Sequence, residues 1–145
     1  MAIRTDRHGL EILDEDTCWQ LLEVHYVGRL AISIANQPEI FPVNYVVDGR
    51  TVVLRVAEGT KLAGALLGTG VAFEIDSADP LFHTGWSVLL RGRAREIETM
   101  DELLQVEALP LTPWGPTERR RWVRITPLTV TGRRIVRSTT DDPGR

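Results

Sequence analysis

The stretch Phe41-Pro42-Val43-Asn44-Tyr45-Val46-Val47-Asp48-Gly49 decides how this 145-residue chain is expected to fold. Its apolar side chains recur at every second position, which is typical of a β-strand with one buried face. Pro42 has no N–H group to donate, so we expect a sheet edge, a bulge, or a backbone that faces something other than a strand. Asp48-Gly49 is a hairpin signal. It leads into a third strand whose buried face is Val52, Leu54 and Val56.

The same two-residue period extends in both directions along the chain. It occurs upstream at residues 29–34, and it returns downstream at residues 71–75 and from about Trp86 to Ile97. A last strand, or pair of strands, is expected from about Trp122 to Val136. The expected buried positions of these outer strands are Leu30, Ile32, Ile34, Val71, Phe73, Ile75, Trp86, Val88, Leu90, Gly92 and Ala94.

Three segments have helical patterns. The first runs from about Asp14 to Tyr26, where Gly28 is expected to end it, and one face carries Cys18, Leu21, Leu22 and His25. Thr60 is a suitable N-cap for a short helix over residues 62–67, and Thr99-Met100-Asp101-Glu102 predicts a capping box before a third. The turns between the early strands are too short for parallel crossovers. The elements therefore predict a mainly β protein of the α+β class, an antiparallel barrel with helices at its ends.

The length and composition indicate one domain, residues 1–137, with a polar tail, 138–145, that is expected to be disordered. The formal net charge of −3 provides no positive field for nucleic acid or a membrane surface, so neither partner is expected. No N-terminal apolar region and no apolar run near the ~18 residues that span a bilayer are visible. With a single cysteine, Cys18, these features predict a cytoplasmic protein.

Several kinds of catalytic site are not indicated. The three histidines, His8, His25 and His83, have no metal-ligand spacing with one another or with Cys18, so no metal site is predicted. There is no nucleophile elbow, Walker loop or dinucleotide-binding fingerprint. His25 is interpreted as a core or interface histidine, and no side chain is assigned as catalytic.

Arg55, Thr60 and Lys61 form the pattern best suited to an anion. Arg55 lies on the third strand and faces away from its buried side, while Gly59-Thr60-Lys61 precedes a predicted helix. An arginine fork, a hydroxyl, a lysine and free amides at a helix start together can bind a phosphate. A solvated loop with a capped helix accounts for the same residues, so the spacing alone leaves both interpretations open.

Six segments in this order and spacing resemble the pyridoxamine 5'-phosphate oxidase-like family, in its branch of small flavin-binding proteins that includes nitroimidazole-resistance proteins. They are Val27–Ala31, Phe41–Gly49, Glu58–Leu62, Val71–Asp76, Gly85–Val88 and Arg91–Ala94. The resemblance covers about Leu13 to Val136. It implies a six-stranded antiparallel split barrel of the FMN-binding type, usually a homodimer with FMN in a groove between the subunits.

The resemblance also implies which residues would contact the cofactor. The backbone of Pro42, Val43, Asn44 and Tyr45 would run along the flavin ring. Arg55, Thr60 and Lys61 would hold the phosphate. Trp86 and Ser87 would approach the flavin bound mainly by the other subunit. A substrate would stack on the exposed ring, bounded by Trp86 and by Trp114 or Trp122.

The chain departs from the oxidase itself. It lacks that enzyme's arginine- and histidine-bearing C-terminal substrate motif, and Val47 stands near the place of a lysine that the oxidase offers to the cofactor. Oxidation of pyridoxamine phosphate is therefore not expected. The resemblance favours an FMN-binding oxidoreductase that acts on a small molecule. Two alternatives remain: a deazaflavin-dependent reductase, with a basic groove of Arg91, Arg93 and Arg95, or a flavin-binding protein without turnover.

Overall fold

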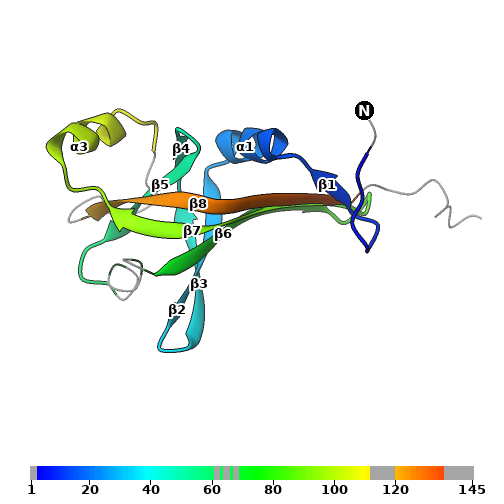
Figure 1. The fold of residues 1–145 in the computed structure, drawn as a ribbon, viewed down its shortest axis with the longest axis horizontal. Helices are drawn as coiled ribbons and strands as arrows, with labels where there is room; N and C mark the ends of the chain where they lie inside the picture. Colours follow the sequence, from blue (N-terminus) through cyan, green and yellow to red (C-terminus); the bar gives the residue numbers. More distant parts are fainter. Residues whose placement is uncertain (1–2, 61–62, 64–65, 67–68, 112–119, 136–145) are drawn as a thin grey trace, which may run out of the picture.

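The computed structural model describes residues 3–60, 63, 66, 69–111 and 120–135. Their strands form one antiparallel sheet with the order β3-β2-β6-β7-β8-β5-β4, and β1 pairs with the far end of β8. Figure 1 shows the long strands β6, β7 and β8 crossing the molecule, with α1 and α3 on one side of them. The strands are β1 (Glu11–Leu13), β2 (Val27–Ile34), β3 (Gln37–Asn44), β4 (Val46–Asp48), β5 (Thr51–Ala57), β6 (Gly70–Asp79), β7 (Thr84–Glu96) and β8 (Arg120–Ile135).

Tyr45 is the residue at which the sheet curls into a split barrel. β3 and β4 stand at opposite ends of the strand order, yet only Tyr45 separates them in the chain. Its amide donates a hydrogen bond to the Tyr26 carbonyl (3.1 Å), and its buried hydroxyl donates one to the Leu22 carbonyl (2.7 Å). The prediction of one continuous strand through this stretch was therefore wrong, because the chain changes pairing partner at Tyr45.

β3 is an edge strand, which is one of the three placements that Pro42 left open. Among the described residues it pairs with β2 alone, and Pro42 stands opposite Arg29. The hairpin predicted at Asp48-Gly49 is also present. Its two loop residues are Gly49 and Arg50, with positive φ angles of 57° and 55°, the conformation that glycine adopts most readily.

Two helices described in full cover parts of the sheet. α1 (Glu15–Val24) begins after Asp14, whose side chain accepts a hydrogen bond from the Thr17 amide, and it ends at Val24. α3 (Met100–Glu107) begins after Thr99, whose hydroxyl accepts one from the Glu102 amide. The expectation that Gly28 ends the first helix was wrong. Gly28 lies inside β2, where an added Cβ would stand 2.3 Å from the Phe73 ring.

The main core lies on one face of the sheet. Leu30, Leu54, Phe73, Leu90 and Ile125 are fully buried there, as the alternation predicted for the first four of them. A smaller apolar cluster of Val53, Ile97, Val106 and Trp122 lies under α3 on the opposite face of β5. Residues 138–145 lie outside the described part of the chain. No helix among the described residues is long and apolar enough to cross a membrane.

Candidate functional site

The first candidate region is the interruption of the sheet between β3 and β5. The β4–β5 ladder pairs Val46 with Val53, and extending it by two residues would place Asn44 opposite Arg55. The ladder stops at Tyr45 instead, because Asn44 pairs with Val27 of β2. β3 and β5 remain in contact. Main chain from two strands thus lines a place where regular strand pairing is interrupted.

Arg55 is half-buried beside this interruption, on the face of β5 that carries Val53. Its guanidinium carbon lies 4.7 Å from the centre of the Trp122 ring, a cation–π contact. Its Nε is buried and has no hydrogen-bond partner among the described residues. A buried donor without a partner costs about 1–3 kcal/mol. This atom is therefore suited to an acceptor supplied by a ligand.

Thr60 makes the N-cap contact predicted for it, while most of the predicted helix over residues 62–67 lies outside the described residues. Its hydroxyl donates to the Ala57 carbonyl (2.7 Å) and accepts from the Ala63 amide (3.2 Å). The hydroxyl proton is thus committed to Ala57, and a role for Thr60 in holding a phosphate stays a prediction. Lys61, the other predicted phosphate ligand, lies outside the described residues, as does Trp114.

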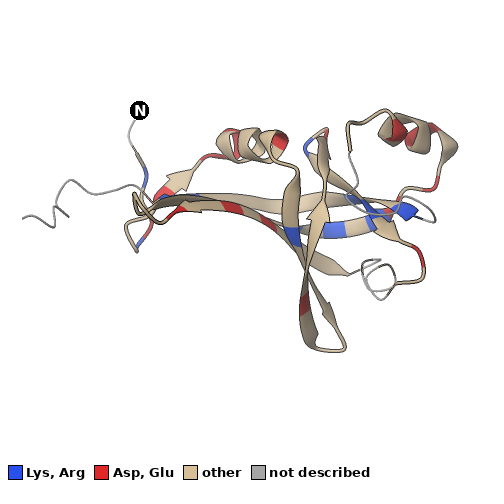
Figure 2. Ribbon diagram, turned by 180° about the vertical axis from the view of Figure 1, so that it is seen from behind, with Lys and Arg blue, Asp and Glu red and all other residues tan. Residues whose placement is uncertain are grey.

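Arg120 is a candidate that sequence reasoning missed. Strand pairing sets Arg55 opposite Trp122 and Ala57 opposite Arg120, so Arg120 projects from the same face of the sheet as Arg55. Only the β5–β8 register reveals this placement, because local sequence does not show which strand pairs with β8. Figure 2 shows basic positions gathered on the strands at the α3 end of the sheet. Arg121, on the other face, pairs with Glu58 (2.8 Å) and Glu96 (3.5 Å).

The predicted ring-binding segment is a mixture of exposed and buried residues. Pro42 is exposed, Val43 packs partly against the core, and the Asn44 amide lies 3.4 Å from the Tyr26 carbonyl. Tyr45 is buried, and this burial raises the pKa of its hydroxyl well above the ordinary value. Tyr45 can therefore meet a ligand only through its main chain, which is how the prediction uses it.

Trp86 and Ser87 lie far from Arg55 within one chain. Arg55 pairs with Trp122, whose neighbour Val123 pairs with Glu96 at the end of β7. Trp86 is ten residues earlier on that strand, or about 33 Å at 3.3 Å per residue. The two groups of predicted residues therefore do not converge in a single chain. Trp86 and Ser87 also point to opposite faces of the sheet, because side chains alternate along a strand.

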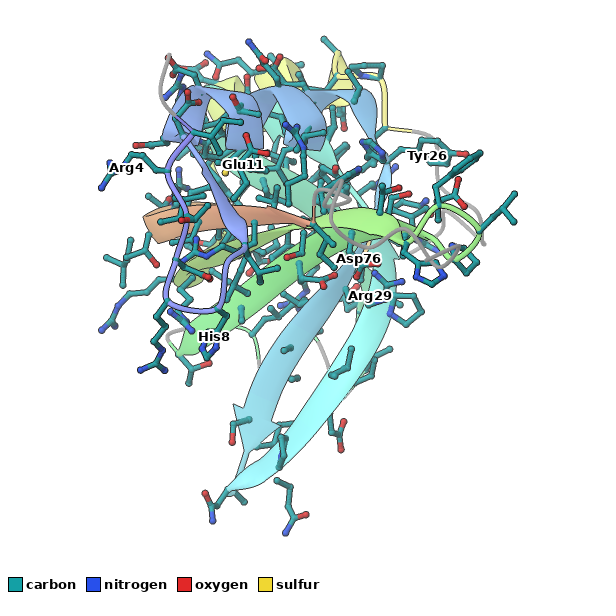
Figure 3. The ribbon with its side chains drawn as sticks, turned by 90° about the vertical axis from the view of Figure 1, so that its right-hand side faces the viewer. Arg4, His8, Glu11, Tyr26, Arg29 and Asp76 are labelled. Atoms are coloured by element: carbon teal, nitrogen blue, oxygen red, sulfur yellow. The ribbon has the colours of Figure 1, made fainter. Side chains whose placement is uncertain are left out.

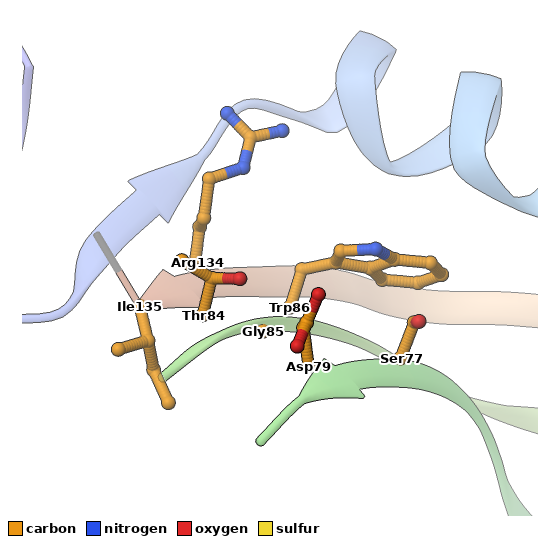
Figure 4. Close-up of a pocket in the computed structure, with 7 residues that line it drawn as sticks. All are labelled: Ser77, Asp79, Thr84, Gly85, Trp86, Arg134 and Ile135. Carbon is orange, nitrogen blue, oxygen red and sulfur yellow. The ribbon is translucent and has the colours of Figure 1, made fainter. Parts of the chain in front are cut away.

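A pocket of about 470 Å³ lies at the Trp86 end of the sheet. Figure 4 shows Trp86 and Arg134 rising from adjacent strands on one side of the sheet. Ser77, Thr84, Asp79 and Ile135 complete most of its lining. The His25 and Trp86 rings meet in a T-shaped arrangement with their centres 4.9 Å apart, and His25 Nδ1 lies 2.8 Å from the Leu21 carbonyl. His25 is thus a packed histidine, as interpreted from the sequence.

The opposite face of the sheet carries a charged cluster near Ser87. Arg29 binds Glu74 (3.2 Å) and Asp76 (3.0 Å), and Figure 3 shows Arg29 and Asp76 side by side. Burial, followed by a hydrogen bond and repulsion from Asp76, raises the pKa of Glu74 to about 7 despite the opposing effect of Arg29. Asp76 and Ser87 are directly paired, and both line a smaller cavity of about 220 Å³.

Comparisons with known proteins agree on one family. Residues 14–134 match the family described as pyridoxamine 5'-phosphate oxidase. The FAD binding protein from Mycobacterium smegmatis is 41% identical, with a TM-score of 0.77, and the match covers 86% of this chain and 99% of that one. An uncharacterized protein from Mycobacterium tuberculosis is 38% identical over 130 residues, covering 86% of this chain and 84% of its own length.

A more distant structure shows how widely the fold is shared. The FAD-binding protein from Mesorhizobium loti is only 21% identical, yet its TM-score is 0.73 over 88% of this chain and 99% of that one. The antiparallel split barrel predicted from the sequence is therefore confirmed. The family match covers most of the chain, and relatives of 38% and 41% identity extend over 86% of it. This chain belongs to the pyridoxamine 5'-phosphate oxidase family.

Proposed function

We propose that this protein binds a flavin nucleotide and works, as a homodimer, as an oxidoreductase on a small molecule. The observation that carries the proposal is the buried Arg55 Nε, which has no hydrogen-bond partner among the described residues and lies where the β3–β5 pairing is interrupted. A phosphate oxygen would supply the missing acceptor through a charge-assisted hydrogen bond. The FAD-binding description of the Mycobacterium smegmatis relative supports a flavin as the ligand.

Two groups of residues fit two different parts of such a cofactor. Arg55, with Thr60 and Lys61, would hold the phosphate that FMN and FAD share, and the main chain of residues 42–45 would lie along the ring. A bound flavin supplies hydride or electron transfer, so the protein needs few catalytic side chains of its own. The chain's own contribution is then to orient the ring and to keep its phosphate in place.

The distance between the two groups of proposed site residues supports a homodimer. Arg55 and Trp86 lie about 33 Å apart along the sheet, so one flavin ring cannot meet both within one chain. A two-fold axis can bring the Trp86 end of one subunit to the Arg55 end of the other, and two-fold pairing is the commonest form of assembly. Trp86 and Ser87 would then approach the flavin held mainly by the partner.

The deazaflavin alternative is less well supported by these arginines. Arg95 of the proposed basic groove binds Glu102 through two contacts of 3.0 and 2.6 Å, so its charge is already paired. Arg91 and Arg93 remain exposed. Two exposed arginines offer less to a long acidic tail than three would. We therefore favour a flavin nucleotide, with FMN and FAD to be separated by affinity.

Flavin titrations of the purified, flavin-stripped protein test the cofactor. FMN, FAD and the deazaflavin coenzyme are each titrated and followed by flavin fluorescence. Arg55→Gln should weaken binding of the preferred flavin at least about tenfold, since a charge-assisted hydrogen bond contributes roughly 1.5–3 kcal/mol. Arg50→Gln is the matched control, because Arg50 is an exposed arginine that pairs with Glu15 and Asp16 on the surface.

Two results would contradict the proposal. Unchanged flavin affinity in a folded Arg55→Gln variant would remove Arg55 from the site, and no uptake of any of the three cofactors would remove the flavin. Turnover is measured separately, as flavin-dependent consumption of NADH or NADPH with candidate acceptors. Tight flavin binding without any turnover would favour a flavin-binding protein that is not an enzyme.

A further inference from the structure

The pocket at the Trp86 end combines a flat aromatic wall with one cation. Strand pairing sets Ser77, Trp86 and Arg134 in one row across β6, β7 and β8. Side chains in such a row have Cβ atoms about 4.5–5.5 Å apart. Trp86 and Arg134 are therefore cross-strand neighbours, and both side chains leave the same side of the sheet, as Figure 4 shows. Arg134 is the only cationic side chain among the residues that line this pocket.

Arg134 keeps donors for a ligand. Its only ion pair among the described residues is with Glu11, where Nη1 and Oε1 lie 3.8 Å apart, beyond hydrogen-bond distance. Its side chain is 41% exposed. A guanidinium carries five N–H donors in a planar fork that matches a carboxylate. The free edge of Arg134 is thus able to bind a carboxylate at two points.

Asp79 determines which end of the ligand carries the charge. It lines the same pocket, and its Oδ1 accepts hydrogen bonds from the amides of Leu81 (3.0 Å) and Phe82 (3.3 Å). Asp79 stands two strands across and two residues along from Arg134, which corresponds to about 12 Å between their Cα atoms. The pocket therefore favours one anionic group beside Arg134 and a neutral, polar edge toward Asp79, Ser77 and Thr84.

We infer that this pocket binds a flat aromatic carboxylate, with its ring against Trp86 and its carboxylate on Arg134. The volume of about 470 Å³ is within the range of small-molecule sites and suits a one- or two-ring compound. We assign the pocket to a ligand other than the flavin, because its own lining includes none of the proposed phosphate-binding residues. The binding of this ligand is independent of the proposed function. Its role as the substrate rests on the proposed function, since only a dimer would bring this pocket to a partner's flavin.

The test uses 2-naphthoate and its uncharged analogue 2-naphthamide as probes on the flavin-free full-length protein. Binding is followed by the indole N–H resonances, and the Trp86 signal is assigned by its loss in Trp86→Leu. The charged probe should bind about tenfold more tightly than the neutral one and should shift the Trp86 resonance. Naphthalene-2,6-dicarboxylate should bind more weakly than 2-naphthoate, because its second carboxylate would approach Asp79.

Variants test separately what the charge of Arg134 and the ring of Trp86 contribute to binding. Arg134→Gln should weaken 2-naphthoate about tenfold and leave 2-naphthamide unchanged, and Arg134→Lys should recover part of the loss. Arg91→Gln, which removes an exposed arginine from the other face of the sheet, should change neither affinity. Trp86→Leu should weaken both probes. Since Trp86 packs partly on the core, Trp86→Phe serves as a milder variant that should retain most of the binding.

The outcomes distinguish this inference from the proposed function. Arg55→Gln should weaken flavin binding at least about tenfold and leave 2-naphthoate binding intact. Loss of naphthoate binding in Arg55→Gln, or displacement of bound flavin by the probe, would place the probe in the flavin site and overturn the inference. Equal affinity for the two probes, or an Arg134→Gln variant that binds 2-naphthoate normally, would also overturn it while leaving the flavin proposal untouched.

Discussion

Glu74 gives a residue-scale prediction about pH and stability. Burial and the neighbouring Asp76 raise its pKa to about 7 in the folded protein, whereas its ordinary value is 4.5. Unfolding therefore releases a proton between these values, and the free energy of unfolding falls as the pH rises through that window. We expect a loss of about 1 kcal/mol, because a side chain that is one-third exposed is screened by solvent. Denaturant unfolding at a series of pH values measures this loss in the free energy of unfolding.

A matched pair of variants isolates this effect. Glu74→Gln should remove most of the pH dependence between about pH 5 and pH 8 and should be more stable than the wild type at the upper end. Glu107→Gln, an exposed change on α3, should leave the pH dependence as it is. An identical slope in the wild type and in Glu74→Gln would show that Glu74 does not ionise in this window.

Individual site residues were predictable to different degrees. Arg55 and Thr60 lie within six residues of each other, so an anion site could be proposed from local spacing. The cluster of Arg29, Glu74 and Asp76 could not be predicted from local spacing, because it forms only when β2 lies next to β6. Neither alternation nor turn chemistry reveals which non-consecutive strands pair. The pocket residue Arg134 was missed for the same reason, since its partner Trp86 lies 48 positions away.

At the scale of elements, Arg124 of β8 links α3 to the sheet through an ion pair. It is 8% exposed and binds Glu102 of α3 (3.0 Å), Asp48 (2.9 Å) and the Thr51 hydroxyl (2.7 Å). Arg124→Gln leaves these acceptors without their cation, and we expect the free energy of unfolding to fall by about 2–3 kcal/mol. Arg95→Gln should cost less than about 1 kcal/mol, because Arg95 binds the same Glu102 from an exposed position.

A double-mutant cycle checks the α3 contact. Arg124→Gln and Glu102→Gln, measured singly and together by denaturant unfolding, should show a favourable coupling above about 0.5 kcal/mol. Strictly additive losses would mean that Arg124 stabilises the sheet through Asp48 and Thr51 alone. The sequence predicted the cap of α3 at Thr99 but assigned Glu102 to a capping box. Its carboxylate is instead bound by two arginines from β7 and β8, which local sequence cannot show.

The division of β3 from β4 shows what periodicity can and cannot predict. Phe41, Val43, Tyr45 and Val47 all pack on the same core, so their alternation continues through the point where the chain leaves β2 for β5. A two-residue period reports which face is buried and not which strand is the neighbour. Pro42 was the better signal, because its missing donor predicted an edge, a bulge or a backbone facing something other than a strand, and β3 occupies an edge.

At the scale of the whole molecule, the proposed dimer should build each flavin site from two chains. Arg55 of one subunit and Trp86 of the other would serve the same ring, so Arg55→Gln and Trp86→Ala damage different halves of every site. A mixed dimer of the two variants then contains one doubly damaged site and one intact site. Random exchange of subunits yields mixed dimers in half of all pairs, so about a quarter of wild-type flavin sites should return.

The measurement is flavin retained after the two variants are unfolded, mixed and refolded together, with sedimentation to establish the dimer. Each variant refolded alone provides the baseline, and a mixture of Arg55→Gln with Arg55→Gln,Trp86→Ala is the matched control that cannot form an intact site. Recovery near a quarter in the first mixture alone would require sites shared between subunits. Dimers that recover no flavin would instead mean that Trp86 serves the site of its own chain or none. The 33 Å separation along β7 would then have to be reconciled with a cofactor bound at one end of the sheet, at about 3.3 Å per residue.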